Sequence, residues 1–511
     1  MTFSPIIQIQ STFAHVAKAL DDDAIPWMTL IQVLLVVVLS FEVLVSLLQL
    51  RTYSEPAPPA TLKPHVTQET YEKSRVYGRD KLQFSIFSLI YEWALSAALL
   101  HAFAYARIWS AAGVVMARLG YTTDSEVVHS LLFLLLSQPV TSIPLLPLSL
   151  YKNFVIEERH GFNKMTLKTF FLDGVKGWAV GVVVAGPFMA GLIKLIRWAG
   201  DSFVAYVVVF LFVFQLVAMT LYPTLIQPLF NKLTPLEDGP LKDRVVALAT
   251  QLNFPLKSIY VIDGSKRSAH SNAYFYGVLP GGSKHIVIYD TLIEKSTPAE
   301  IEAVLAHELG HWAHSDTSKL MGLSQVQISI TMSLFTLFIH NASLFRAFGL
   351  RYAPLTASAS TKISSLKSAL LPLSSQVKTP FAAPLNPFSV SVGYLPIVVG
   401  LELFQLVLHP LDSLVKFSIN AAIRRMEYAA DRFAAQQPRA PELIGGSGKH
   451  KAEDVALNEP YTTLLGKALI KLHIQNLSTM HHDALYSAYH YSHPTLTERL
   501  DELEKLKSKS K

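Results

Sequence analysis

The sequence predicts a predominantly α-helical, multi-pass membrane protein with a soluble part that contains a small β-sheet. Half of the 511 residues are hydrophobic, only 16% are charged, and the mean hydropathy is +0.32. Such a composition is typical of chains that cross a lipid bilayer. The chain has no cysteine, so disulfides and thiolate metal sites are excluded. The net charge of +6 includes no long basic cluster interleaved with aromatics, which argues against a nucleic-acid partner.

Seven apolar segments are long enough to cross a bilayer, at about 20 residues per crossing. They are residues 26–50, 84–106, 127–150, 177–197, 202–222, 320–341 and 391–410. The first segment lacks a small-residue cleavage site, so we interpret it as a retained helix and not as a signal peptide. Glu92 and Glu402 lie inside two of the spans. They indicate a wet interior cavity, because ionisable groups in hydrocarbon are costly unless they face water or a partner.

The charges of the loops predict the orientation of the spans. The N-terminal tail has Lys18 against the three aspartates at 21–23, whereas the loops that follow the first and third spans are rich in lysine and arginine. Basic loops face the cytosol. We therefore expect a lumenal N-terminus, with residues 223–319 and the C-terminal region after 410 on the cytosolic side, where they can meet.

The soluble parts divide the rest of the chain. Apolar or alternating runs at 258–263, 272–279 and 284–290 predict three strands, with a turn at Pro280-Gly281-Gly282. Low-complexity stretches at 352–390 and 436–460 predict weakly ordered insertions, and the lysine-rich C-terminal end predicts a solvated tail. We expect five spans in residues 1–222, the sheet and the motif helix in 223–319, two spans in 320–410, and a C-terminal protease region with the third metal ligand in 411–511.

A metal-binding motif lies in the second of these regions. Thr297, followed by Pro298 and by Glu300, is a helix start. About three turns later come His307-Glu308-Leu309-Gly310-His311. Histidines four residues apart project from one face of a helix and can bind one metal ion together, with Glu308 close enough to handle a bound water. This is the HExxH pattern of zinc metallopeptidases, and it predicts one Zn²⁺ per chain.

A catalytic zinc usually has three protein ligands. His314 shares the face of the two motif histidines, but three ligands on one straight helix give poor tetrahedral geometry. The longer motif that places histidine at position 317 is absent, because that residue is Thr317. We therefore expect a carboxylate from another helix, and Glu427 is the best candidate. Asp431, one turn later, can accept the free ring N–H of a zinc histidine. An ordinary amphipathic helix, in which Arg424 pairs with Glu427, is the alternative interpretation.

Longer motifs carry a resemblance to a known family. They are Glu157–Lys164 (EERHGFNK), Pro228–Lys232 (PLFNK), Ser265–Gly277 (SKRSAHSNAYFYG), the HExxH helix, Glu427–Asp431 and Ser492–Pro494. In these the chain resembles the type I CAAX prenyl proteases, which are integral-membrane zinc metalloproteases that process prenylated proteins. The resemblance spans most of the chain but not the two low-complexity insertions. It implies a barrel of seven helices around a large water-filled chamber, with a gluzincin-like zinc protease domain on the cytosolic side.

The resemblance also implies residue roles and a reaction. Asn272, Ala273 and Tyr274 fall on the strand that pairs with the substrate backbone. His493 falls near the scissile carbonyl and can donate to the oxyanion, although taken alone it is more simply a capping or packing residue. Glu308 takes a proton from water and passes it to the leaving amine. The implied reaction removes the last three residues after a prenylated cysteine, with a second cleavage nearer the substrate N-terminus.

The implied setting is the endoplasmic-reticulum membrane, and also the inner nuclear membrane, with a monomeric protein that contacts the lipid bilayer and prenylated CAAX substrates. Two other functions stay open from the sequence. One is a quality-control protease that cuts unprenylated or translocon-stalled proteins. The other is a channel, transporter or receptor with a vestigial HExxH, although such proteins do not need Glu308, Glu427 and Asp431 together.

Overall fold

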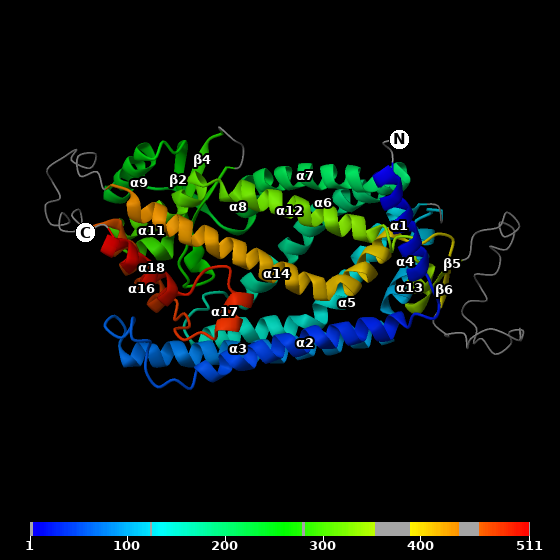
Figure 1. Cartoon of the computed structure of the whole chain (residues 1–511), viewed down its shortest axis with the longest axis horizontal. Helices are drawn as coiled ribbons and strands as arrows, with labels where there is room; N and C mark the ends of the chain where they lie inside the picture. Colours follow the sequence, from blue (N-terminus) through cyan, green and yellow to red (C-terminus); the bar gives the residue numbers. More distant parts are fainter. Residues whose placement is uncertain (1–3, 123–124, 278–281, 353–388, 439–458, 510–511) are drawn as a thin grey trace, which may run out of the picture.

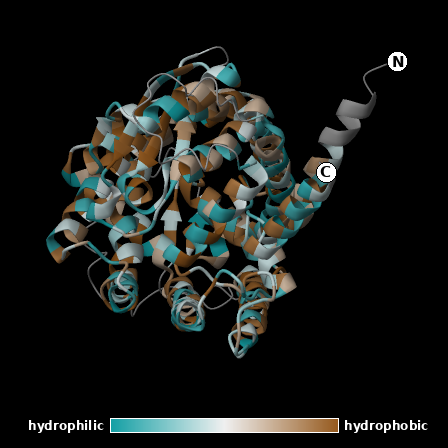
Figure 2. Ribbon diagram, turned by 90° about the vertical axis from the view of Figure 1, so that its left-hand side faces the viewer, coloured by the Kyte–Doolittle hydropathy of each residue, from teal (hydrophilic) through white to brown (hydrophobic). Residues whose placement is uncertain are grey.

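The computed structural model describes residues 4–122, 125–277, 282–352, 389–438 and 459–509. The molecule is elongated, and long helices run along most of its length (Figure 1). One end carries the sheet and several shorter helices. Figure 2 looks onto this end, where hydrophilic residues lie between hydrophobic ones. Most of the expected insertions at 352–390 and 436–460, and most of the expected turn at 280–282, lie outside the described residues.

Five helical runs of the described chain are long and apolar enough to cross a membrane. They are α2 (Trp27–Thr52), α3 (Gln68–His101), the run Glu126–Glu157 that contains α5 (Glu126–Tyr151), the run Leu167–Phe230, and α14 (Ile397–Gln436). The fourth run holds two of the expected spans, because α6 (Leu167–Ala199) and α7 (Phe203–Leu221) are separated only by a 3₁₀ turn. The prediction of a mostly helical, multi-pass membrane protein is therefore confirmed.

The expected span at 320–341 has a different outcome. It corresponds to α12 (Asp316–Phe335), which begins four residues earlier than expected and is not among the five apolar runs. Polar residues such as Ser324, Gln325 and Gln327 recur along this helix and lower its hydropathy. Gln325 donates a hydrogen bond to Gln215 of α7 at 2.8 Å. At least one of these polar side chains therefore binds a neighbouring helix. The count of seven spans stays a prediction.

The membrane helices share one apolar core. It gathers buried aromatic side chains from α2, α5, α12 and α14, together with α4 (Ala104–Arg118), and examples are Trp27, Trp109, Phe133, Phe335 and Phe404. The shorter elements of the described chain are α1 (Ser4–Leu20), α8 (Gln227–Phe230), α10 (Asp290–Lys295), α13 (Ala342–Ala347), α17 (Ala484–His490), β5 (Leu350–Tyr352) and β6 (Val390–Val392).

A four-stranded mixed sheet of order β1-β2-β4-β3 forms the soluble end. Its strands are β1 (Leu233–Pro235), β2 (Leu256–Ile262), β3 (Ala273–Tyr276) and β4 (Lys284–Tyr289). The three expected strands are present, and β1 was missed because three residues show no alternation. The β3 strand is shorter than expected. Asn272 precedes it, although the Asn272 carbonyl still accepts a hydrogen bond from Tyr289 N at 3.0 Å.

Helices α9 (Pro240–Gln251), α11 (Pro298–Ala313), α16 (Tyr461–Gln475) and α18 (Leu496–Lys509) pack with the sheet around a second apolar core. The C-terminal end was expected as a solvated tail, and that prediction is wrong in part. The chain is helical through Lys509, because Leu496, Leu500 and Leu503 recur at helical spacing and Leu503 is buried. Lys505 on the same helix stays 70% exposed.

Candidate metal centre

The motif helix α11 begins where its sequence predicts. Thr297 Oγ1 accepts a hydrogen bond from Glu300 N, and Thr297 N donates to Glu300 Oε2 at 2.8 Å. This capping box satisfies two backbone donors that a helix start otherwise leaves unpaired. Because the start fixes the register, His307 and His311 lie on one face of α11, directed at α14.

The two motif histidines and Glu427 of α14 converge. His307 Nε2 lies 3.4 Å from Glu427 Oε2, and His311 Nε2 lies 3.3 Å from Glu427 Oε1. One ligand atom from each residue lies within 4.8 Å of the other two. Metal–ligand bonds of about 2.0–2.2 Å in a tetrahedron place ligand atoms about 3.3–3.6 Å apart. Glu427 Oε2 is buried, and ring nitrogens of His307 and His493 lie 3.4 and 2.8 Å from it. The spacing and the donor atoms of His307, His311 and Glu427 therefore fit a divalent ion such as zinc.

Carboxylates hold the other ring nitrogen of each histidine. His307 Nδ1 lies 2.8 Å from Asp431 Oδ1, and His311 Nδ1 lies 3.0 Å from Asp316 Oδ2. When Nδ1–H donates to these oxygens, the Nε2 lone pairs are directed at the metal position. Asp431 thus has the geometry that the sequence predicts. Asp316 was missed, and the available signal was an acidic residue at the start of the next helix, one turn beyond His311.

An arginine from the C-terminal helix completes this arrangement. Arg499 of α18 donates to both oxygens of Asp431, from Nη2 at 2.6 Å and from Nε at 2.8 Å. Both side chains are largely buried, so the bidentate pair offsets the cost of burying the carboxylate. No local pattern marks Arg499. The alternative pairing of Arg424 with Glu427 is not observed, because Arg424 donates instead to both oxygens of Glu498 at 2.9 and 2.8 Å.

Gly310 lets α11 and α14 approach closely. A Cβ atom at this position would lie 3.0 Å from Ala430 Cα and 3.1 Å from Ala430 O, which is closer than side-chain carbons normally pack. Ala430 lies between Glu427 and Asp431 on α14. The glycine of the motif therefore sets how near the carboxylates of α14 come to the histidines of α11.

Glu308 and His493 flank the three converging groups. Burial raises the pKa of the Glu308 carboxyl above its usual value, while the charges of the nearby histidines act in the opposite direction. A raised pKa suits a group that takes up a proton near neutral pH. His493 Nδ1 lies 2.8 Å from Glu427 Oε2, and the His493 side chain is 62% exposed. His493 is therefore placed to meet a molecule that reaches the metal position.

The predicted substrate strand β3 is an edge strand of the sheet. It pairs with β4 through Ala273↔Ile288 and Tyr274↔Val287, so its other side has backbone groups available to a peptide. The side chain of Ala273 is buried, and the hydroxyl of Tyr274 is hydrogen-bonded to the Gln227 amide. If these residues bind substrate, they do so mainly through the backbone.

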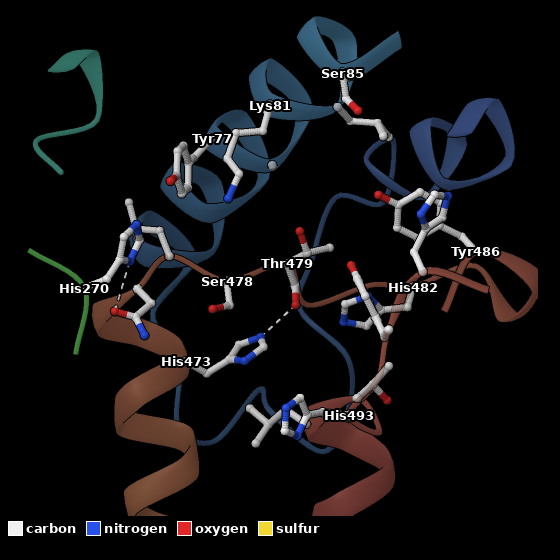
Figure 3. Close-up of a pocket in the computed structure, with 18 of the residues that line it drawn as sticks. Tyr77, Lys81, Ser85, His270, His473, Ser478, Thr479, His482, Tyr486 and His493 are labelled. Carbon is white, nitrogen blue, oxygen red and sulfur yellow. Dashed lines mark hydrogen bonds between the residues drawn. The ribbon is translucent and has the colours of Figure 1, made fainter. Parts of the chain in front are cut away.

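A cavity of about 1030 Å³ opens beside the metal position. Helix α3 lines one side of it, and the segment from α16 to the start of α18 lines the other (Figure 3). Its wall includes Glu92, His493 and Arg499, but not Glu402. A cavity beside Glu92 is therefore present, and it reaches His493 and Arg499, which contact Glu427 and Asp431.

Comparison with known proteins places this site in a family. The family model described as CAAX prenyl protease N-terminal, five membrane helices, matches residues 49–232, and the model for peptidase family M48 matches residues 235–507. CAAX prenyl protease 1 of Saccharomyces cerevisiae is 37% identical over 96% of this chain and 98% of its own length. The Arabidopsis thaliana homologue is 37% identical over 93% and 97%, and the human homologue is 32% identical over 88% and 89%.

The fold agrees with this comparison. The crystal structure of Ste24p from S. mikatae superposes with a TM-score of 0.78 at 37% identity, covering 94% of this chain and 99% of that one. The two family models together match most of the sequence, and the range 235–507 includes the HExxH helix, Glu427 and Asp431. The chain belongs to peptidase family M48, within the group that carries the CAAX prenyl protease N-terminal membrane domain.

Proposed function

We propose that this protein is a zinc-dependent membrane endopeptidase that hydrolyses the bond after the prenylated cysteine of CAAX proteins and releases the last three residues. The observation that carries the proposal is the convergence of His307, His311 and Glu427 to within 4.8 Å, in a chain that is 37% identical to a CAAX prenyl protease over nearly its full length. One Zn²⁺ per chain, held by these three residues, is part of the proposal.

The residues of the chain divide the chemistry among them. Zinc, when bound, supplies Lewis acidity toward a carbonyl and lowers the pKa of a water to about 7. Glu308 takes the proton of the attacking water and delivers it to the leaving amine. His493 donates a hydrogen bond to the oxyanion as it develops. The free edge of β3, with Asn272 before it, holds the peptide extended.

The surroundings support a lipid-modified substrate. The cavity beside the metal position is lined by α3, which is one of the apolar runs that can cross a membrane. A barrel of seven spans around a larger chamber is part of the proposal, with α12 as the sixth span. The basic loops support a cytosolic active site, a lumenal N-terminus and a cytosolic C-terminus. The proposed location is the endoplasmic-reticulum membrane, including the inner nuclear membrane, and the proposed state is a monomer.

The test uses the full chain, purified in detergent and reconstituted in lipid. Wild-type protein should contain about one zinc per chain and should release a tripeptide from a farnesylated CAAX peptide. Glu308→Gln should keep the zinc and lose cleavage, because the substitution removes the base and leaves the ligands. The proposal is refuted if zinc-loaded wild-type protein cuts neither a farnesylated nor an unprenylated peptide.

The unprenylated peptide separates two kinds of protease. A CAAX-processing enzyme should cut the farnesylated peptide far faster, because the isoprenoid adds apolar binding area. Equal rates on both peptides would instead favour a quality-control protease. A farnesylated precursor with a longer N-terminal extension tests the second cleavage, which should appear as an additional fragment after the tripeptide is released.

A further inference from the structure

Two lysines on the wall of the cavity lie outside ion-pair distance of every carboxylate in the described residues. Lys81 of α3 and Lys152, which follows α5 directly, both line the cavity that also contains His493 and Arg499. Figure 3 shows Lys81 pointing from α3 into the open space. Its ammonium lies 4.6 Å from the ring centroid of Tyr77. Within the described residues, neither Lys81 nor Lys152 makes an ion pair or a side-chain hydrogen bond.

The nearby carboxylates are committed elsewhere or are too distant. The Tyr77 hydroxyl donates its single hydrogen to the Glu157 carboxylate, whose oxygens lie 2.8 and 2.9 Å away, and Glu157 Oε2 lies 3.6 Å from His270 Nε2. Glu92 lines the same cavity but is eleven residues from Lys81 along α3, or roughly 16 Å at the helical rise per residue. Lysines gather at the cytosolic ends of membrane spans, and this tendency sets the orientation of the spans. That tendency does not explain why Lys81 and Lys152 both line one cavity beside the metal position.

The sheet directs a substrate toward this cavity. Antiparallel pairing is the commoner arrangement of strands, and a peptide added antiparallel to β3 would run its C-terminus past Asn272 toward His270. His270 lines the same cavity as Lys81 and Lys152. Three extended residues beyond the scissile bond span about 10 Å. The released part of a CAAX peptide is therefore long enough to leave the metal position and end inside the cavity.

We propose that Lys81 and Lys152 bind the free α-carboxylate at the C-terminus of the substrate and so position the bond three residues before it for cleavage. This inference rests on the proposed function and names the group that the cavity recognises. Lysine is a strongly hydrated point charge that suits a carboxylate at a site open to water. Two positive charges on the wall of one cavity repel each other, and an anion that binds near both is attracted by each of them.

The test compares two farnesylated peptides that differ only at the C-terminus, one a free acid and one a carboxamide. Wild-type protein should cut the acid with a kcat/KM about tenfold to hundredfold higher, the usual value of hydrogen bonds to a charged group. The Lys81→Met, Lys152→Met double variant should cut the acid about as slowly as the amide, and it should retain zinc. Lys168→Met is the matched control. Lys168 is an exposed lysine in the first turn of α6 that does not line the cavity, and its variant should keep the wild-type preference.

The outcomes separate the two proposals. If wild-type protein cuts the acid and the amide equally well, the carboxylate site is wrong and the proposed function stands. If the double variant loses activity on both peptides by the same factor, the lysines bind lipid headgroups or stabilise the fold. In that case the proposed carboxylate site is also wrong. If zinc-loaded wild-type protein cuts neither peptide, the proposed function fails and this inference fails with it.

Discussion

Replacing Gly310 by alanine tests whether the contact between α11 and α14 sets the metal geometry. The new Cβ would lie 3.0 Å from Ala430 Cα, 3.1 Å from Ala430 O and 3.2 Å from Ala430 Cβ. Carbon atoms pack best at about 3.5–4.0 Å, so α14 must move away from α11 by a few tenths of an ångström. Glu427 lies three residues before Ala430, and its carboxylate moves away with the helix.

The expected result is weaker zinc binding without loss of the fold. Displacing a ligand by this amount is comparable to removing a group that orients it, which costs about tenfold to hundredfold in metal affinity. Zinc affinity is measured by competition with a chelator of known strength. Cleavage of a farnesylated peptide at limiting zinc should fall in parallel and should recover as zinc is added.

The control for this prediction is Gly322→Ala in α12, where a new Cβ meets nothing within 4 Å. Alanine is favoured over glycine inside a helix by about 1 kcal/mol, so this control should raise the melting temperature and leave zinc affinity unchanged. The reasoning is refuted if Gly310→Ala behaves in the same way. That outcome would mean that the close approach of the two helices is incidental to the metal site.

Three further predictions concern groups around the site. Asp316→Asn should weaken zinc binding about tenfold to hundredfold in the chelator assay, because the carboxylate that orients a ligand histidine is lost; wild-type affinity would show that Asp316 does not orient the ring. Glu302→Gln should destabilise the soluble end by about 3–5 kcal/mol, seen as a lower melting temperature, because Arg244 and Glu302 are both 5% exposed and lie 2.8 Å apart; an unchanged melting temperature would contradict this. Burial lowers the pKa of His473 to about 4, and burial with the His473 charge lowers the pKa of His482 to about 4. Because both pKa values are lower in the folded state, the neutral rings contribute their full stability above about pH 6.5 and lose it as the pH falls to about 4. For His473 the loss is about 3 kcal/mol. The melting temperature should therefore fall over this pH range, and a constant melting temperature would contradict the prediction.

The sequence predicts those parts of the site that depend on local periodicity. The capping box at Thr297 fixes the register of α11, so a spacing of four residues is enough to place His307 and His311 on one face. The same rule relates Glu427 to Asp431 on α14. Arg499 follows no such rule, because its contact with Asp431 exists only once α18 packs against α14. Tertiary packing of that kind has no signature in a single segment.

The differences between the predicted and the observed fold have the same origin. Composition alone describes the lysine-rich end as a tail, whereas Leu503 packs into the core and makes the segment helical. Hydropathy likewise separates α12 from the more apolar runs. Its polar residues are explained by neighbours such as Gln215, which accepts a hydrogen bond from Gln325. In both segments the deciding partner lies on another element.

Helix α14 links the membrane core to the metal position. It is one helix of 40 residues from Ile397 to Gln436, or roughly 60 Å long at the helical rise per residue. Phe404 near its start is buried in the core of the membrane helices, and Glu427 near its end faces the motif histidines. Pro410 lies inside this helix between the two residues, and a proline inside a helix bends it. The position of the proposed third ligand therefore depends on this bend together with the packing of the membrane core.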